Sequence, residues 1–165
     1  MIYDLLLAGP PVPPTSLAEA LAEAVRTEGA DVDVADRDGD QNGRDWTAPV
    51  LCGYIRLRGD LSLALDLYVE DALVNEAPAE PELARRLAMA LGVPVLYPAE
   101  EDLPSAHWLA TSSGESVRAR LYASDDEPPV HTIDAVESAV AQLPHIRVSD
   151  LPEIAREKGD GQWRR

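Results

Sequence analysis

Hydrophobic and polar residues alternate along the chain with two different periods, and these periods predict where strands and helices lie. Residues 1–8, MIYDLLLA, form a short apolar run that is typical of a buried strand. Residues 30–36, ADVDVAD, alternate valine with aspartate, which predicts a strand with one exposed face. Residues 93–98, VPVLYP, predict a further short strand, and residues 107–122 predict a hairpin with a Ser-Gly turn.

Two more strands, at residues 50–57 and 61–69, follow each other closely enough for their pairing to be predicted. Each is expected to bury one face. In the first strand that face comprises Leu51, Gly53, Ile55 and Leu57, and in the second it comprises Leu61, Leu63, Leu65, Leu67 and Val69. A two-residue turn would set Leu57 opposite Ser62 and mismatch the faces. We therefore expect a three-residue connection with a bulge, which keeps leucine opposite leucine.

Apolar residues that recur every three to four positions predict two helices with identifiable ends. Ser16 and Glu19 form a capping box at the start of the first helix, and Gly29 is a suitable end. Pro81 fits the first turn of the second helix, and Gly92 ends it. Their core stripes are Leu17, Leu21, Ala24 and Val25 in the first and Leu83, Leu87, Ala90 and Leu91 in the second.

A third helix is expected to begin at Thr132, because apolar residues recur there with a helical spacing. Its core face comprises Ile133, Val136, Val140 and Leu143. Consecutive strands joined by short loops imply antiparallel pairing, so the order of elements predicts an α+β fold, with a mostly antiparallel sheet and helices packed on one side. We expect residues 1–150 to form a single domain and residues 151–165 to be a frayed C-terminal tail.

The chain has 165 residues and carries 30 acidic against 14 basic residues, a formal net charge of −16. Binding to nucleic acids or to anionic membrane surfaces depends on lysine and arginine, so this balance argues against both. It favours a basic protein partner, which long-range attraction would steer toward the chain. The alternative is that the acidity serves only to keep the protein soluble.

The cysteine content and the N-terminus bear on the compartment. Cys52 is the only cysteine, so no internal disulfide can form, which is typical of a reducing compartment. Residues 1–11 carry an acid, no basic region and too short an apolar run for a signal peptide. No stretch approaches the length needed to cross a membrane. We therefore expect a cytoplasmic location.

The segment DGDQNG resembles the opening of a calcium-binding loop, because Asp38, Asp40 and Asn42 are followed by Gly43. Such a loop needs a bidentate carboxylate at its twelfth position, where this chain has Pro49. Asp-Gly and Asn-Gly pairs also form turns without any ion, since they tolerate positive φ. The sequence therefore predicts a turn between two strands and no metal site.

The sequence favours a non-enzymatic role. It contains neither a G-x-S-x-G nucleophile motif nor a glycine-rich loop for phosphates, so we expect no catalytic residues and no cofactor. The histidines, His107, His131 and His145, are isolated in the sequence. The alternative is a small hydrolase or isomerase in which His107 meets a carboxylate. A position of His107 or His131 in a pocket within about 3 Å of a carboxylate would favour that alternative.

Two groups of acids lie in predicted loops beside prolines, and they are the candidate partner-binding residues. The groups are Glu100, Glu101 and Asp102, and Asp125, Asp126 and Glu127. Neighbouring prolines stiffen the backbone, which lowers the entropic cost of presenting these carboxylates to a partner.

Residues 83–122, LARRLAMALGVPVLYPAEEDLPSAHWLATSSGESVRARLY, combine a helix ending in Leu-Gly, a strand, and a Trp-Leu pair that precedes a glycine turn. This block resembles one found in small acidic actinobacterial immunity proteins of polymorphic toxin systems. The resemblance implies an inhibitor that neutralises a basic toxin or enzyme by steric and electrostatic blockade, and it carries over no catalytic residue. A further alternative is a structural subunit of a larger assembly, such as a homodimer that pairs an open sheet edge.

Overall fold

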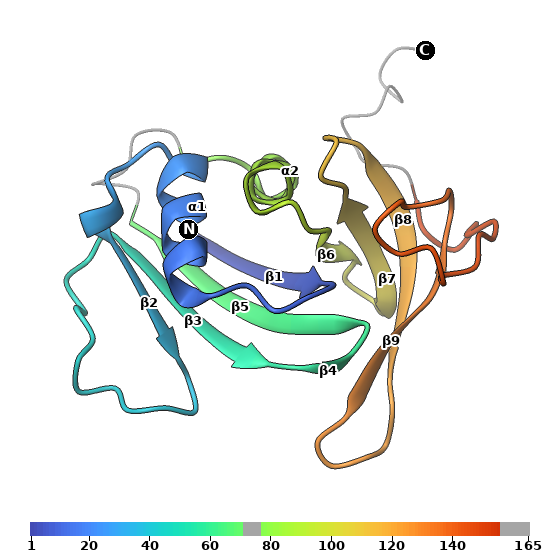
Figure 1. Cartoon of the computed structure of the whole chain (residues 1–165). Coiled ribbons are helices and arrows are strands. Elements are labelled where there is room, and N and C mark those ends of the chain that lie inside the picture. Colours follow the sequence, from blue (N-terminus) through green and yellow to red (C-terminus); the bar gives the residue numbers. More distant parts are fainter. Residues whose placement is uncertain (71–76, 156–165) are drawn as a thin grey trace.

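The computed structural model describes residues 1–70 and 77–155 and shows a strand-rich mixed α/β fold (Figure 1). Its helical elements are α1 (Pro14–Ala24), the short 3₁₀-helix η1 (Gly29–Asp31) and α2 (Glu80–Leu91). Its strands are β1 (Ile2–Ala8), β2 (Val32–Asp36), β3 (Val50–Arg56), β4 (Arg58–Gly59), β5 (Leu61–Val69), β6 (Val95–Glu100), β7 (Leu103–Ala110), β8 (Ser116–Ala123) and β9 (Val130–Val136). The predicted mixture of helices with a mostly antiparallel sheet is confirmed.

The described strands form one sheet in the order β2-β3-β5-β1-β6-β7-β8-β9-β4, and this sheet curls back on itself. The curl arises because β4, which belongs to the connection between β3 and β5, pairs in parallel with the start of β9. At Gly59 φ is +96°, and a Cβ there would lie 2.1 Å from the carbonyl oxygen of His131, so only glycine allows this close approach. Asp60 adds a second link, since its carboxylate accepts a hydrogen bond of 2.8 Å from Ile133 N–H. The two halves of the sheet therefore meet at β4 (Figure 1).

The main core lies between the two helices and strands β1, β3, β5 and β6. Figure 1 shows α1 and α2 side by side above β1 and β5. Pro81 lies in the first turn of α2, and Gly92 caps its end with a left-handed φ of 71°, as predicted. The predicted stripe of α1 is buried, with Leu17 and Leu21 fully inaccessible.

Both predicted ends of the first helix are wrong. Its N-cap is Pro13, and no side chain makes a capping bond, so Ser16 lies within the first turn. A proline at the first helical position has a suitable φ and needs no donor, which explains the earlier start. The helix ends at Ala24 instead of near Gly29, and Arg26 takes a left-handed φ of 57°.

A second core fills the curl between β6–β9 and the ends of β1 and β5. The chain after β9 closes this half, and Leu151 and Ile154 are fully buried against Ala106 and Ala135. The expected tail thus begins with packed side chains, while residues 156–165 lie outside the described part.

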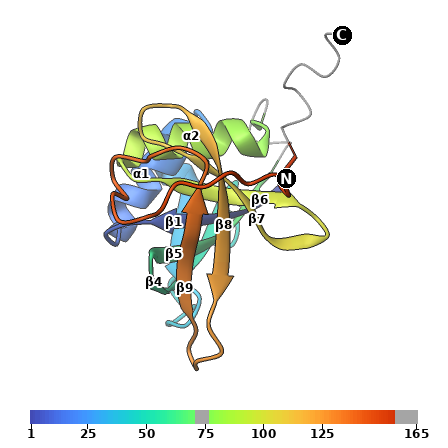
Figure 2. The same ribbon diagram turned by 90° about the vertical axis from the view of Figure 1, so that its right-hand side faces the viewer.

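The helix expected after Thr132 is wrong, because residues 130–136 form strand β9 antiparallel to β8 (Figure 2). The apolar residues of the predicted helical face are nevertheless buried in the second core: Ile133, Val136, Val140 and Leu143. Their spacing fits a helix, but β8 offers a row of backbone partners, and β-branched residues suit a strand. Tertiary pairing therefore decides this segment.

The predicted register of β3 and β5 is also wrong. Leu57 N–H donates to the carbonyl oxygen of Ser62 at 2.9 Å, which is the pairing that the sequence argument rejected. The leucines of β5 nevertheless meet a buried face, because Cys52 pairs with Leu67 and Tyr54 pairs with Leu65. The buried face of β3 consists of Val50, Cys52 and Tyr54, and the leucines and isoleucine placed there by prediction lie on the other face.

β2 runs parallel to β3, whereas consecutive strands were expected to be antiparallel. The loop of residues 37–49 is long enough to return the chain to the end at which β2 began, which a parallel neighbour requires. This loop does not leave the sheet, because Arg37 lies against Gly53 in the middle of β3.

Candidate functional site

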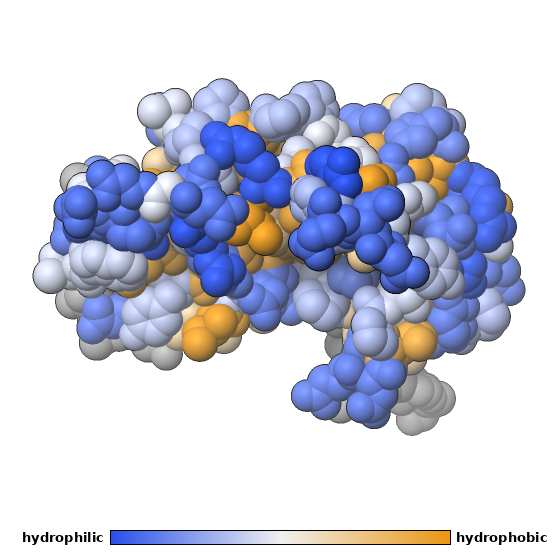
Figure 3. Space-filling view, turned by 90° about the horizontal axis from the view of Figure 1, so that it is seen from below, coloured by the Kyte–Doolittle hydropathy of each residue, from blue (hydrophilic) through white to orange (hydrophobic). Residues whose placement is uncertain are grey.

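One face of β1, β3 and β5 is only partly covered. Alternate residues of these strands, such as Tyr3, Leu5 and Leu7, point into the main core, so the residues between them point away from the helices. We call these outward residues the open face: Ile2, Asp4 and Leu6 from β1, Leu51, Gly53 and Ile55 from β3, and Ala64, Asp66 and Tyr68 from β5. Seen from below, hydrophobic residues reach the surface between hydrophilic ones (Figure 3).

A hollow of about 490 Å³ lies between this face and the loop of residues 37–49, and we call it the open-face groove. Its apolar lining includes Ile2, Trp46, Leu51 and Tyr68, and its polar lining includes Arg37 and Asp66. Ile2 is 74% exposed, Trp46 60% and Tyr68 42%. Large apolar side chains that surround a concave surface are typical of a site where another molecule binds.

The loop that forms one wall of the groove is anchored by Arg44. The Arg44 side chain is only 7% exposed, and its Nε donates to Asp33 Oδ2 at 2.7 Å. Its guanidinium carbon also lies 4.5 Å from the centre of the Trp46 ring, a cation–π contact. Asp33 accepts a second hydrogen bond from the backbone of Asp45 at 3.1 Å. These contacts hold Trp46 at the edge of the groove.

The calcium-like segment of this loop makes turns. Asp38 N–H donates to Asp36 Oδ1, and Asn42 N–H donates to Asp40 Oδ1, both at 2.9 Å. These bonds form Asx turns, and the two glycines of the segment are not among the residues with positive φ. The turn therefore depends on the carboxylates. Within residues 1–70 and 77–155, no three His, Cys, Asp or Glu side chains gather closely enough to hold a metal ion.

His107 and His131 line a second hollow, of about 440 Å³, next to Leu6. Burial lowers the pKa of His107, whose Nδ1 lies 3.3 Å from the carbonyl oxygen of Ser105. The Nδ1 atom of His131 is buried, and no described group is bonded to it. In the part of the chain that the structure describes, neither imidazole is hydrogen bonded to a carboxylate.

The histidine that does meet a carboxylate is His145. Its Nε2 lies 2.8 Å from Asp60 Oδ1, and its side chain is 60% exposed. Because the same carboxylate also binds Ile133 N–H, this pair joins the segment after β9 to the β3–β5 connection. Its position indicates a structural role in closing the curl.

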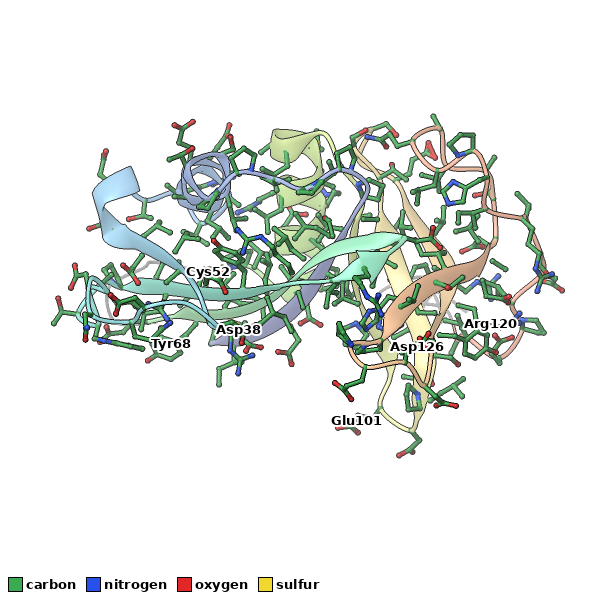
Figure 4. All side chains as sticks on the ribbon, turned by 60° about the horizontal axis from the view of Figure 1, so that its bottom comes forward. Asp38, Cys52, Tyr68, Glu101, Arg120 and Asp126 are labelled. Atoms are coloured by element: carbon green, nitrogen blue, oxygen red, sulfur yellow. The ribbon has the colours of Figure 1, made fainter. Side chains whose placement is uncertain are left out.

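The six acids predicted to bind a partner lie at two turns. Glu100 ends β6 and is half-buried, whereas five are exposed: Glu101 and Asp102 before β7, and Asp125, Asp126 and Glu127 between β8 and β9. Because β6 to β9 are consecutive antiparallel neighbours, both turns lie at the same end of these strands. Figure 4 shows Glu101 and Asp126 on one side of the molecule and Tyr68 on the other.

Cys52 lies on the buried face of β3 and packs in the main core. Its side chain is fully inaccessible, and burial raises the pKa of its thiol to about 12. A thiol in that state is a poor nucleophile at neutral pH.

None of the residues that surround the open-face groove is predicted from the sequence to bind a partner. The signal was present in β1, where Ile2 and Leu6 make both faces of the strand apolar. In β5 the alternation also places Tyr68 on the same face as Asp66, opposite the leucines. A strand that is apolar on both faces indicates either full burial or a surface that binds something.

The chain matches no family model, no curated protein and no solved structure. Among the described helices, none is both long and apolar enough to span a membrane. The geometry of the open-face groove and the charge of the chain are therefore the features that bear on function.

Proposed function

We propose that this chain is a non-enzymatic cytoplasmic binding protein that occludes a basic protein, the action of an inhibitor or immunity protein. The observation that carries the proposal is the exposure of Ile2, Trp46 and Tyr68 around one groove. Aromatic side chains at the centre of a contact supply most of the binding energy of many interfaces. The resemblance of residues 83–122 to immunity proteins points to the same class of protein.

The charge of the chain supports a basic partner. The formal net charge is −16, and the two acidic turns, residues 100–102 and 125–127, project at one end of the sheet. Acids outside the centre of a contact act mainly through long-range attraction, which raises the association rate, whereas apolar anchors determine how long the complex lasts. The groove and the two turns would therefore have different tasks in one binding reaction.

The enzymatic alternative has less support in the described residues. It required His107 or His131 in a pocket close to a carboxylate. Both histidines line a hollow, but the described partner of His107 is a backbone carbonyl, and none is described for His131 Nδ1. The exposed side chains of Ile2, Trp46 and Tyr68 around the groove support a binding protein instead.

The alternative of a dimer that pairs through a sheet edge would use β2, which lies at the end of the sheet. This strand carries Asp33 and Asp36, and charged residues on an edge strand oppose pairing with another chain. Asp33 is also held by Arg44, which ties the strand to the loop of residues 37–49. Docking at the groove is therefore the better supported mode.

The experiment is capture of a basic protein from the native host at low salt, followed by binding measurements with the purified partner. Trp46→Ala combined with Tyr68→Ala should weaken binding at least tenfold, because two anchors are removed. Met89→Ala, which removes another exposed side chain on α2, is the matched control and should leave the affinity unchanged. A captured partner that binds the double variant as tightly as the wild type would refute the groove as the binding site. Failure to capture or inhibit any basic protein would refute the proposed function.

A further inference from the structure

The open face carries a charged strip between two apolar regions. Asp4 of β1 stands directly opposite Asp66 of β5 in the antiparallel pair. Arg37 reaches Asp66 from the loop and forms an ion pair with it. Among the described residues no base forms an ion pair with Asp4. The strip therefore holds two carboxylates on adjacent strands and one guanidinium that comes from the loop.

Like charges directly opposite each other on a sheet destabilise it, so this pair is a cost to the fold. The pKa of Asp4 is raised by partial burial and by its contacts with Asp66. Both observations agree that, within residues 1–70 and 77–155, the ionised form of Asp4 has no compensating cation. A positive group from outside would supply that compensation and would gain from the neighbouring carboxylate as well.

Apolar residues lie on both sides of this strip. On one side are Ile2 and Tyr68, which line the open-face groove. On the other side are Leu6 and Ala64, which line a hollow of about 390 Å³ together with Ile55. Along β1 the order is therefore apolar at Ile2, acidic at Asp4 and apolar at Leu6.

The spacing of this order identifies the shape of a matching ligand. Residues two apart in a strand are about 6.6 Å apart, and an extended segment lying along β1 repeats that distance between alternate side chains. A segment with an apolar, a basic and an apolar side chain at positions i, i+2 and i+4 would match all three regions. A helix would need the same three side chains at intervals of three or four residues instead.

We propose that the open face binds an extended segment of the basic partner that sets a lysine or arginine side chain against Asp4 and Asp66. An apolar side chain on each side of it contacts Tyr68 and Leu6. This inference rests on the proposed function, since it names the chemistry by which the partner docks. It assigns the central contact to a cross-strand acid pair that is separate from the acidic turns at residues 100–102 and 125–127.

The test is an NMR titration of the full chain with the peptide acetyl-Ser-Leu-Ser-Arg-Ser-Leu-Ser-amide. Short peptides bind weakly, so peptide concentrations of up to about 10 mM are needed. Saturable shifts are expected at the amides of residues 2–6, 51–55 and 64–68. Replacing the arginine of the peptide by neutral citrulline, or placing both leucines next to the arginine, should weaken binding about fivefold or more.

Variants of the chain provide the matching control. Asp4→Asn should weaken the arginine peptide about fivefold and leave the citrulline peptide unaffected, because only a charge contact is lost. Asp102→Asn removes an exposed acid at a distant turn and should change neither. Absence of saturable shifts, or shifts confined to the turns at residues 100–102 and 124–129, would overturn the inference. If the captured partner binds wild type and Asp4→Asn equally, the inference fails while the proposed function stands.

The C-terminal residues of the chain itself are the competing candidate for binding to the open face. Residues 156–165, REKGDGQWRR, carry four basic residues and Trp163. In the full chain, Trp163→Ser combined with Arg164→Ser should leave the affinity for the peptide unchanged if the groove binds a separate partner. Tighter peptide binding by this variant, with shifts at the open-face amides before any peptide is added, would replace the proposed partner by the chain's own tail.

Discussion

The side chain of Arg37 lies across Gly53, so that a Cβ at Gly53 would come within 2.8 Å of Arg37 Cγ. This relationship positions the loop of residues 37–49 over the open face and lets Arg37 reach Asp66. Glycine in a strand is weakening by itself, so its presence here is explained by the side chain that crosses it.

A double-mutant cycle tests this relationship. Gly53→Ala should fail to stabilise the wild type, because Arg37 has to move, but it should stabilise a chain that already carries Arg37→Ala by roughly 0.5 kcal/mol. Urea denaturation of the four proteins measures the coupling. Additive effects would mean that Arg37 does not rest on Gly53 in solution.

The Asp4 carboxylate should make stability depend on pH. Burial and the neighbouring Asp66 raise its pKa above the ordinary 3.8, so the folded chain binds this proton more tightly than the unfolded chain does. Asp4 therefore lowers stability at neutral pH, and the loss disappears as the pH falls through its folded pKa toward 3.8. Asp4→Asn should raise the free energy of unfolding at pH 7 by less than about 1 kcal/mol, since the group is exposed. The gain should vanish below about pH 4, and a gain that grows on acidification would contradict the assignment.

The pair of Arg118 and Glu137 should be one of the most sensitive ion pairs among the described residues. Their side chains are only 13% and 15% exposed, and Arg118 also donates to the carbonyl oxygens of Leu151 and Ile154. Arg118→Ala removes the guanidinium from the buried Glu137 carboxylate, which keeps its hydrogen bond from the backbone N–H of residue 118, and it releases the segment after β9, so it should cost about 3 kcal/mol. Arg56→Ala removes an exposed pair and should cost much less. Equal costs in denaturant titrations would show that burial does not distinguish the pairs.

The exposed acids of the β8–β9 turn should affect association with a basic partner. Asp125→Lys combined with Asp126→Lys should slow association strongly at low salt and less as the Debye length shortens to about 8 Å near 0.15 M salt. Folding should hardly change, because both positions are exposed. Stopped-flow association rates across a salt series make the comparison. Equal rates at low salt would remove this turn from the binding surface.

Cys52 should react with thiol reagents only when the chain unfolds. Its thiol is fully buried and its pKa is raised to about 12, so little thiolate forms in the folded state. The rate of labelling by a chromogenic disulfide should follow the unfolded fraction as urea is added. The raised pKa also means that stability should fall above about pH 9, where the unfolded thiol ionises. Rapid labelling in buffer without urea would show that β3 opens locally.

The sequence by itself determined the elements whose signals are local. The helical stripe and Gly92 located α2, and the Ser-Gly turn located the β7–β8 hairpin. It also located a turn at the DGDQNG segment, although that turn is formed by the carboxylates of Asp36 and Asp40 and not by glycines with positive φ. Each of these depends on residues that are close together in the chain, where periodicity and turn chemistry act directly.

Only the tertiary structure decided which faces are buried and where a partner could bind. β3 is apolar on both faces, so its pattern does not choose between Cys52 and Leu51 as the core residue, and packing against the helices does. The segment at residues 130–136 became a strand because β8 and β4 offered it backbone partners on both sides. The open face exists for the same reason, since Asp4 meets Asp66 only once β1 and β5 have paired across more than sixty positions of chain. Long-range pairing sets these contacts, and a local pattern carries no information about the strand that will lie beside it.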